Sequence, residues 1–240
     1  MTTVVLVADE PAEGVACGDL VAETDLTPAD GLALYRAMLG DTMATLARST
    51  IDILVNYPEG SEDELRAIAA EAMPADRFED VRFEPQVGSD FSAIAGNAIT
   101  HLIRDEDRQS AAALRPCTPR LARSIVDEAI LNLRRDEVML GPADRGQVYL
   151  AGFAEPIDFA GVFAENPIEE VTRRSRAADL SVGFVRHRTL LSSAEDLETV
   201  RRRIAADHLA GKPVPERLWT VLQERGLGVE EGNVQRTATE

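Results

Sequence analysis

The sequence predicts a three-layer α/β/α fold with a mostly parallel, Rossmann-like mixed sheet. Short apolar runs rich in β-branched residues alternate four times with segments of helical spacing, which is typical of strand–helix units in a parallel sheet covered on both faces. After Glu137, two strand-like runs follow one another without a helix between them, which indicates an antiparallel strand beside the parallel ones. The 240 residues, 45% of them hydrophobic, suffice for one substantial core.

The first half of the chain supplies the four strand–helix units. Thr27 and Pro28 provide an N-cap and a first-turn proline for the first long helix, which extends to about residue 46. Ser61 and Glu64 have the spacing of a capping box before a second helix that ends near residue 73. The expected strands are 4–8, 51–57, 81–86 and 110–114, and the remaining helices are 90–103 and 119–134.

The second half completes the sheet and ends in a short appendage. The expected strands are 137–140, 148–153 and 181–187, and the expected helices are 168–179, 194–209 and a short one around Leu218 and Trp219. Residues 233–240 are polar, and we expect them to be disordered. We therefore expect one α/β domain over residues 1–210, followed by a C-terminal helix and polar tail over residues 211–240.

The charge composition is strongly acidic and almost free of lysine. Asp and Glu number 42 against 25 Lys and Arg, the formal net charge is −17, and Lys212 is the single lysine. Arginine pairs bidentately with carboxylates, and salt screens the repulsion of a carboxylate-rich surface. We interpret this as adaptation to a salt-rich cytosol, and an arginine-favouring genome is the alternative. Both interpretations argue against nucleic-acid binding, because no basic stripe could neutralise phosphates.

The cysteines and histidines form no recognisable site in the sequence. Cys17 and Cys117 are too few and too far apart for a metal site or a disulfide framework, and we expect both to be reduced. His101, His187 and His208 fall singly in different elements, whereas a structural zinc site needs clustered ligands. The N-terminal apolar run is too short for a signal sequence or a membrane span, so we expect a cytoplasmic protein. The sequence leaves a homo-oligomer open.

Ligands of open parallel sheets bind beyond the carboxyl ends of the strands. The loops to consider are 9–25, 86–90, 115–118 and 141–147. Gly14 and Gly18 in the first loop and Gly88 in the second can let backbone amides approach a phosphate, although the spacing fits neither a Walker loop nor a Rossmann fingerprint. Because residues 9–20 hold four carboxylates and no basic residue, a plain solvated loop is the alternative.

Several short motifs follow one another in order along residues 4–204. They are Leu-Val-Ala-Asp-Glu-Pro-Ala-Glu-Gly14, Ala33-Leu-Tyr-Arg-Ala-Met-Leu-Gly-Asp41, Gln86 with Gly88, Gly141-Pro-Ala143 with Tyr149-Leu-Ala-Gly152, and Ser193-Ala-Glu-Asp-Leu197. Their order and spacing resemble a little-characterised glycosyltransferase-A-fold family of the nucleotide-diphospho-sugar transferase superfamily, related to the guanylyltransferases of molybdenum-cofactor and phospholactate biosynthesis. The resemblance implies that residues 1–210 have this fold, that a nucleotide or nucleotide sugar is the ligand, and that an active enzyme uses a divalent metal, Mg²⁺ or Mn²⁺.

The functional motifs of that family are altered in this chain. Ala-Cys-Gly-Asp-Leu at residues 16–20 stands where the resemblance places a Lys-Thr-Arg-Leu run that holds phosphates. Cys117 stands where a metal-binding aspartate is expected, and Arg145 begins the stretch that replaces Asp-Gly-Gly-Tyr. Ser192 lies within the stretch that replaces Asp-Val-Asp, while Asp196 survives as a cap or first-turn acid of the helix that follows. Several such losses are expected to slow transfer by many orders of magnitude.

These departures favour a catalytically degenerate member that is kept for small-molecule or partner binding. The alternative is an active glycosyl- or nucleotidyltransferase in which Arg115 and Arg145 clamp phosphate, Asp144 and Arg145 are candidate catalytic residues, and Asp9 or Asp144 is a weak metal candidate. Both arginines can instead pair with surface carboxylates. A third hypothesis is thiol chemistry at Cys117, whose pKa a helix N-terminus would lower, although no histidine is placed to act as its base.

Overall fold

The core of the molecule is a seven-stranded mixed sheet in the order β3-β2-β1-β4-β6-β5-β7. The computed structural model describes residues 1–230 and 233–236. The strands are β1 (Thr2–Val7), β2 (Asp52–Tyr57), β3 (Arg82–Pro85), β4 (Ser110–Leu114), β5 (Val138–Pro142), β6 (Val148–Phe153) and β7 (Val182–Phe184). Neighbouring strands are parallel except at β6, which runs antiparallel to β4 and β5. The predicted mostly parallel α/β fold is confirmed.

Helices cover both faces of this sheet, because alternate residues of a strand point to opposite faces. In β1, Val4 and Leu6 belong to one buried apolar cluster, and Val5 and Val7 belong to another. The helices that pack on the first cluster are α2 (Pro28–Leu46), α3 (Glu62–Ala72) and α6 (Arg123–Asn132), and those on the second are α5 (Phe91–Arg104) and α7 (Pro167–Ala177). The sheet is therefore the middle layer of three.

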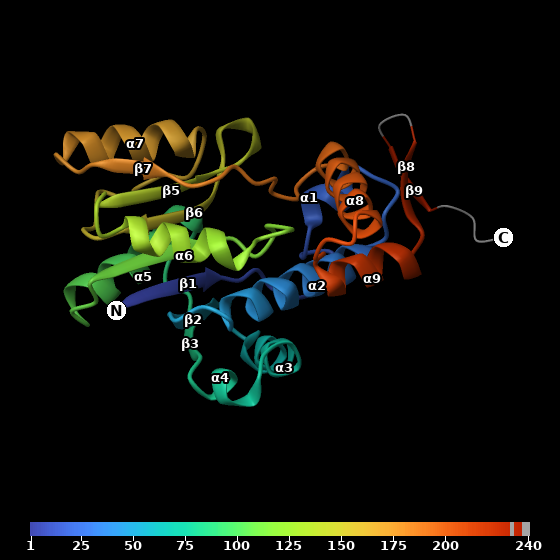
Figure 1. Ribbon diagram of the computed structural model, residues 1–240, viewed down its shortest axis with the longest axis horizontal. Coiled ribbons are helices and arrows are strands. Elements are labelled where there is room, and N and C mark those ends of the chain that lie inside the picture. The colour runs from blue at the N-terminus through green and yellow to red at the C-terminus, as the bar shows by residue number, and fades with distance from the viewer. Residues whose placement is uncertain (231–232, 237–240) are drawn as a thin grey trace.

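The C-terminal helices pack on the side of α2 that faces away from the sheet. Leu34 and Met38 of α2 share a third buried cluster with α8 (Ala194–Leu209) and α9 (Glu216–Glu224). Figure 1 shows α8 and α9 together at one end of the molecule, beside the short helix α1 (Gly18–Ala22). Both broad sides of α2 are thus buried, while the predicted division of the chain at residue 210 stays a prediction.

Asp41 of α2 fixes the start of α9. Its carboxylate accepts hydrogen bonds from the backbone N–H groups of Arg217 (3.2 Å) and Leu218 (3.0 Å). These are first-turn N–H groups with no partner inside the helix, and the N-cap residue, Pro215, has no side chain that could accept them. A residue distant in sequence therefore supplies the missing cap.

The ends of two early helices match the prediction only in part. Thr27 caps α2 as predicted: its hydroxyl accepts a hydrogen bond from the N–H of Asp30 (3.2 Å), whose carboxylate accepts one from the N–H of Thr27 (2.9 Å). The capping box predicted at Ser61 is wrong, since the Ser61 side chain makes no capping hydrogen bond. Its backbone lies at φ −97° and ψ 0°, whereas a capping residue is usually extended.

The helix predicted for residues 119–134 begins only at Arg123. The hydroxyl of Thr118 donates to the backbone carbonyl of Arg115 (2.7 Å), and Arg120 has a φ of +62°. A positive φ is incompatible with a right-handed helix, so residues 116–122 form a loop after β4. Two short helices, α1 and α4 (Ala75–Glu79), are additional to the predicted elements.

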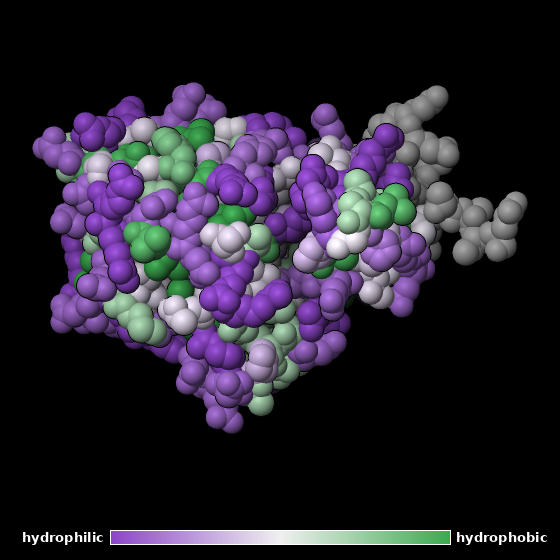
Figure 2. Space-filling model, in the orientation of Figure 1, coloured by the Kyte–Doolittle hydropathy of each residue, from purple (hydrophilic) through white to green (hydrophobic). Residues whose placement is uncertain are grey.

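The predicted disordered tail is partly wrong. Residues 233–236 form β9 (Asn233–Arg236), which pairs antiparallel with β8 (Leu227–Glu230) and so satisfies backbone hydrogen-bonding groups. Residues 237–240 lie outside the described residues. No helix in the described ranges is long and apolar enough to cross a bilayer. In Figure 2 most of the visible face is hydrophilic, with small, scattered apolar patches.

Candidate functional site

A cavity of about 590 Å³ lies where the loops after β1, β4, β5 and β7 meet. We call this cavity the crevice. It is lined by these candidate residues among others: Asp9, Gly18, Arg115, Asp144 and Arg145. The structure therefore brings together side chains from four separate loops at the carboxyl ends of parallel strands, as expected for this topology.

Two of the candidate glycines do not line the crevice. Gly14 lies in the exposed loop after β1, with a φ of +81° and open space where a Cβ would lie. Gly88 has a φ of +142°, and a Cβ there would lie 2.8 Å from the backbone nitrogen of Ile94. Gly88 therefore lets the chain turn tightly into α5, which is a structural role.

Arg115 carries a half-buried positive charge that has no anionic partner among the described residues. Its guanidinium carbon lies 3.8 Å from the centre of the Phe91 ring, a cation–π contact. Within the described ranges Arg115 makes no ion pair, and its Nε is buried without a hydrogen-bond partner. Burial lowers the pKa of Arg115, and the nearby Asp9 partly opposes this shift. The expectation that Arg115 pairs with a surface carboxylate is therefore wrong.

Asp9 lies at the carboxyl end of β1 and faces the same crevice. Tyr35 of α2 holds its backbone, because the phenol oxygen accepts from the Asp9 N–H (2.7 Å) and donates to the Asp9 carbonyl (3.0 Å). Asp9 is an exposed residue, yet the protein around its carboxyl group displaces water and so raises the pKa of that group, and Arg115 opposes the rise. Asp9 and Arg115 are thus electrostatically coupled without forming an ion pair.

Arg145 is held by the start of α8. It lies in the 3-10 turn η1 (Asp144–Gly146) at a φ of +55°, and its guanidinium donates to Ser192 Oγ (3.0 Å) and Asp196 Oδ2 (2.6 Å). The Asp196 side chain is only 4% exposed and also accepts from the Ser192 N–H (3.1 Å). Burial acts to raise the pKa of Asp196, but hydrogen bonds from Arg145, Ser193 and Ser192 hold it below its usual value. Arg145 thus bridges η1 and α8.

A second cavity, of about 970 Å³, opens on the other side of Arg145. It lies between α1 and α8 and shares Asp19, Arg145 and Ser192 with the crevice. The ion pair between Arg145 and Asp196 therefore lies at the boundary between the crevice and this second cavity. Sequence reasoning missed both Asp19 and the buried partner Asp196 as parts of this boundary.

Asp144, the remaining acidic candidate, contacts a histidine. Its Oδ1 lies 3.1 Å from Nε2 of His187, and both side chains are partly exposed. Among the described residues no three His, Cys, Asp or Glu side chains converge as a protein-only metal site requires. Asp9 and Asp144 alone could contribute to a cation only together with ligand phosphates.

The two cysteines both lie at the crevice. Cys17, the N-cap residue of α1, and Cys117, in the loop after β4, both line it and are free thiols. The nearby Cys17 thiol, together with burial, raises the pKa of Cys117 well above its usual value. The predicted lowering of this pKa is wrong, because α6 begins six residues later, at Arg123. Their separation in sequence concealed this proximity.

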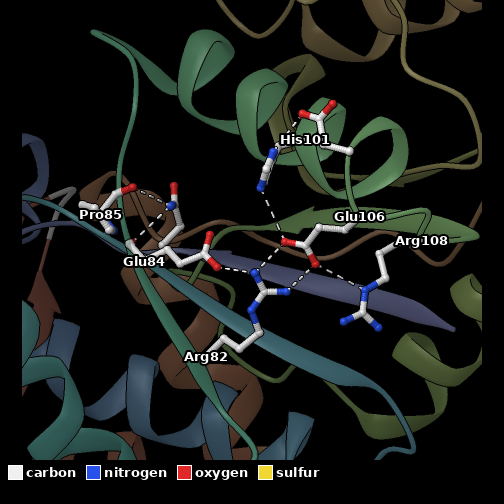
Figure 3. Close-up of polar contacts among 8 residues, drawn as sticks. Arg82, Glu84, Pro85, His101, Glu106 and Arg108 are labelled. Carbon is white, nitrogen blue, oxygen red and sulfur yellow. Dashed lines mark hydrogen bonds and ion pairs between the residues drawn. The ribbon is translucent and has the colours of Figure 1, made fainter.

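The other dense group of charged side chains is fully paired. Figure 3 shows Arg82 of β3 bound to Glu84 and Glu106, with Arg108 and His101 contacting Glu106 as well. This group lies where β2, β3 and β4 begin, at the edge of the sheet opposite to the crevice. The charges of this group pair with one another, whereas the guanidinium of Arg115 has no ion-pair partner in the part of the chain that the structure describes.

Comparison with known proteins adds the fold's identity. No family model and no curated protein matches the sequence. A solved structure from Desulfovibrio desulfuricans G20, described as a nucleotide-diphospho-sugar transferase, superposes with a TM-score of 0.77 at 19% identity over 93% of this chain and 94% of that one.

Two synthesising enzymes are also similar in structure. The 4-diphosphocytidyl-2C-methyl-D-erythritol synthase of Anaerococcus prevotii has a TM-score of 0.54 at 13% identity, over 85% of this chain and 96% of its own. The CMP:2-keto-3-deoxy-manno-octonic acid synthetase, solved with CTP, has a TM-score of 0.51 at 9% identity, over 86% and 99%. The chain therefore has the fold of the nucleotide-diphospho-sugar transferases.

Proposed function

We propose that this protein binds a nucleotide or nucleotide sugar in the crevice and has lost the transfer reaction. The observation that carries the proposal is Arg115, a half-buried cation at the carboxyl ends of the strands with a buried Nε and no anionic partner in the described ranges. A buried charge is costly unless it is paired. A ligand phosphate would supply the missing partner, because guanidinium binds phosphate bidentately.

The surroundings of Arg115 suit the rest of such a ligand. Phe91 packs against one side of the guanidinium and keeps it in place. Val15, in the loop after β1, is 51% exposed and lines the crevice, so it offers an apolar contact to a base or sugar ring. Asp9 can accept hydrogen bonds from sugar hydroxyls. Among proteins of this fold, the octonic acid synthetase was solved with CTP.

The case against transfer rests on the groups that would have to stabilise the leaving diphosphate. Cys117 stands where the family resemblance places a metal-binding aspartate. Arg145 is already bound to Asp196 and Ser192, so its charge is largely neutralised by the protein. Transition-state stabilisation of a leaving diphosphate commonly requires a metal or several free cations.

An active transferase with rearranged ligands is the second candidate. Its support is that Asp9, Asp144, Arg115 and Arg145 line one cavity. In such an enzyme, Mg²⁺ or Mn²⁺ would be held by these aspartates together with the diphosphate, and Arg145 would have to leave Asp196.

Calorimetric titration tests the proposal. The chain is titrated with nucleoside triphosphates and nucleotide sugars, with and without Mg²⁺, at low and high KCl. R115Q should weaken binding about 10-fold to 100-fold, the loss of a charge-assisted hydrogen bond. R104Q is the matched control, because Arg104 is exposed and lies at the opposite end of α5 from Phe91.

The outcomes separate the two candidates. Absence of binding, or equal binding by wild type and R115Q, would overturn the proposal. Release of diphosphate or nucleotide during incubation, lost in the D9N and D144N variants, would replace binding by the active transferase.

A further inference from the structure

The chain has two cysteines, and the fold brings both to the lining of the crevice. Cys17 comes from the loop after β1 and Cys117 from the loop after β4, so two segments that are distant in sequence each place a thiol at the same cavity. Both side chains pack against the same two buried clusters, the one beneath α2 and α6 and the one between α2 and α8. Their placement is thus fixed from two sides by the core.

We infer that Cys17 and Cys117 are a reversible dithiol–disulfide pair that controls ligand access to the crevice. The control of ligand access rests on the proposed function, whereas formation of the bond does not. A metal site is a poorer explanation of the pair, because no third His, Cys, Asp or Glu among the described residues completes one.

The chemistry needs an external oxidant, either a low-molecular-weight disulfide or a peroxide. Cys17 is the first thiol to react, since burial and its neighbour keep Cys117 protonated. With a disulfide, the Cys17 thiolate attacks one sulfur and releases one thiol, and Cys117 then displaces the other thiol and gives its proton to it. With hydrogen peroxide, Cys17 becomes a sulfenic acid as water leaves, and Cys117 closes the bond with loss of a second water.

The position of the bond explains how oxidation would weaken ligand binding. Cys17 has a φ of +53° and begins α1, whose neighbouring residues Gly18 and Asp19 also line the crevice. Cys117 is two residues from Arg115. A Cys17–Cys117 bond would tie α1 to the loop that carries Arg115, across the wall where we place the ligand phosphates. We therefore expect the oxidised protein to bind nucleotide at least about tenfold more weakly, which is about 1.4 kcal/mol.

Thiol counting and intact mass test the bond itself. After treatment of the purified full chain with oxidised glutathione, we expect both free thiols to disappear and the mass to fall by two hydrogen atoms, with full reversal by dithiothreitol. The melting temperature should rise by about 5 °C or more, because the bond closes a long loop in the unfolded chain. C117S should retain glutathione on Cys17, since it lacks the thiol that displaces it.

Specific results would overturn the inference. They are two persistent thiols in wild type under these conditions, a stable glutathione adduct on wild type, or a bond that joins two chains on a non-reducing gel. Nucleotide titration of the reduced and oxidised protein then tests control of access, and equal affinity would overturn that part. If the reduced protein binds no nucleotide, the proposed function fails while mass and melting temperature still decide whether the bond forms.

Discussion

Replacement of Asp196 by asparagine isolates the link between η1 and α8. Asparagine keeps an oxygen that can accept from the backbone and hydroxyl of Ser192, but it removes the charge that pairs with Arg145. A hydrogen bond to a charged group contributes about 1.5–3 kcal/mol, and water screens the part owed to Arg145, which is 52% exposed. We therefore expect D196N to lower the free energy of unfolding by about 1–2 kcal/mol.

Thermal unfolding followed by circular dichroism measures this loss, which should lower the melting temperature by about 2–8 °C at this chain length. D127N is the matched control, since Asp127 pairs with Arg123 at 3.0 Å on an exposed helix face. The control should change stability by less than about 0.5 kcal/mol. Equal losses of stability in D196N and D127N would refute the reasoning that burial makes the Arg145–Asp196 pair stronger than an exposed pair.

The stability difference between wild type and D196N should also depend on pH. Because the folded-state pKa of Asp196 lies below its unfolded value of about 3.9, the carboxylate stabilises the protein above that value. This contribution is lost as the pH falls through the folded-state pKa. The difference in stability between wild type and D196N should therefore narrow in strong acid, and a difference that widens there would contradict the assignment.

Three further predictions follow from packing, capping and charge. G141A should lower the free energy of unfolding by about 1–3 kcal/mol, because the new Cβ would lie 2.5 Å from the Tyr149 ring. G18A is the control: its Cβ would meet open space, so it should change thermal stability much less. D41A should lower the free energy of unfolding by about 1–2 kcal/mol and increase proteolysis after α8, because the N–H groups of Arg217 and Leu218 lose their cap. Unchanged proteolysis would contradict this. Raising KCl to molar levels should raise the melting temperature, because it screens a net charge of −17, and a fall would count against salt adaptation.

The sheet and most helices could be predicted because the residue pattern that determines each of them lies within one short segment. Periodicity within each segment fixes whether its apolar residues line one face of a helix or a strand, as Val4 and Leu6 illustrate. Helix ends were less predictable, since they depend on backbone angles that the sequence leaves open. Pro119 resembles a first-turn residue, yet Arg120 with its positive φ delays α6 to Arg123.

The candidate site was predictable in its location and not in its contacts. Topology alone brings the loops of Asp9, Arg115 and Arg145 to one edge of the sheet. Which side chains then pair depends on how loops close in three dimensions. Nothing in the local sequence indicates that Arg145 binds Asp196, or that Cys17 and Cys117 line the same cavity. Both pairs come from segments that no periodic pattern relates.

The burial of α2 on two sides decides how the chain can be divided in practice. A chain that ended at residue 210 would lack α9 and so uncover Leu34 and Met38, which are fully buried in the whole molecule. Exposed apolar surface of this kind promotes aggregation. Helix α2 also positions Asp9, through the hydrogen bonds of its residue Tyr35. The shortest fragment suitable for ligand studies must therefore extend through α9, even though no residue of α9 lines the crevice.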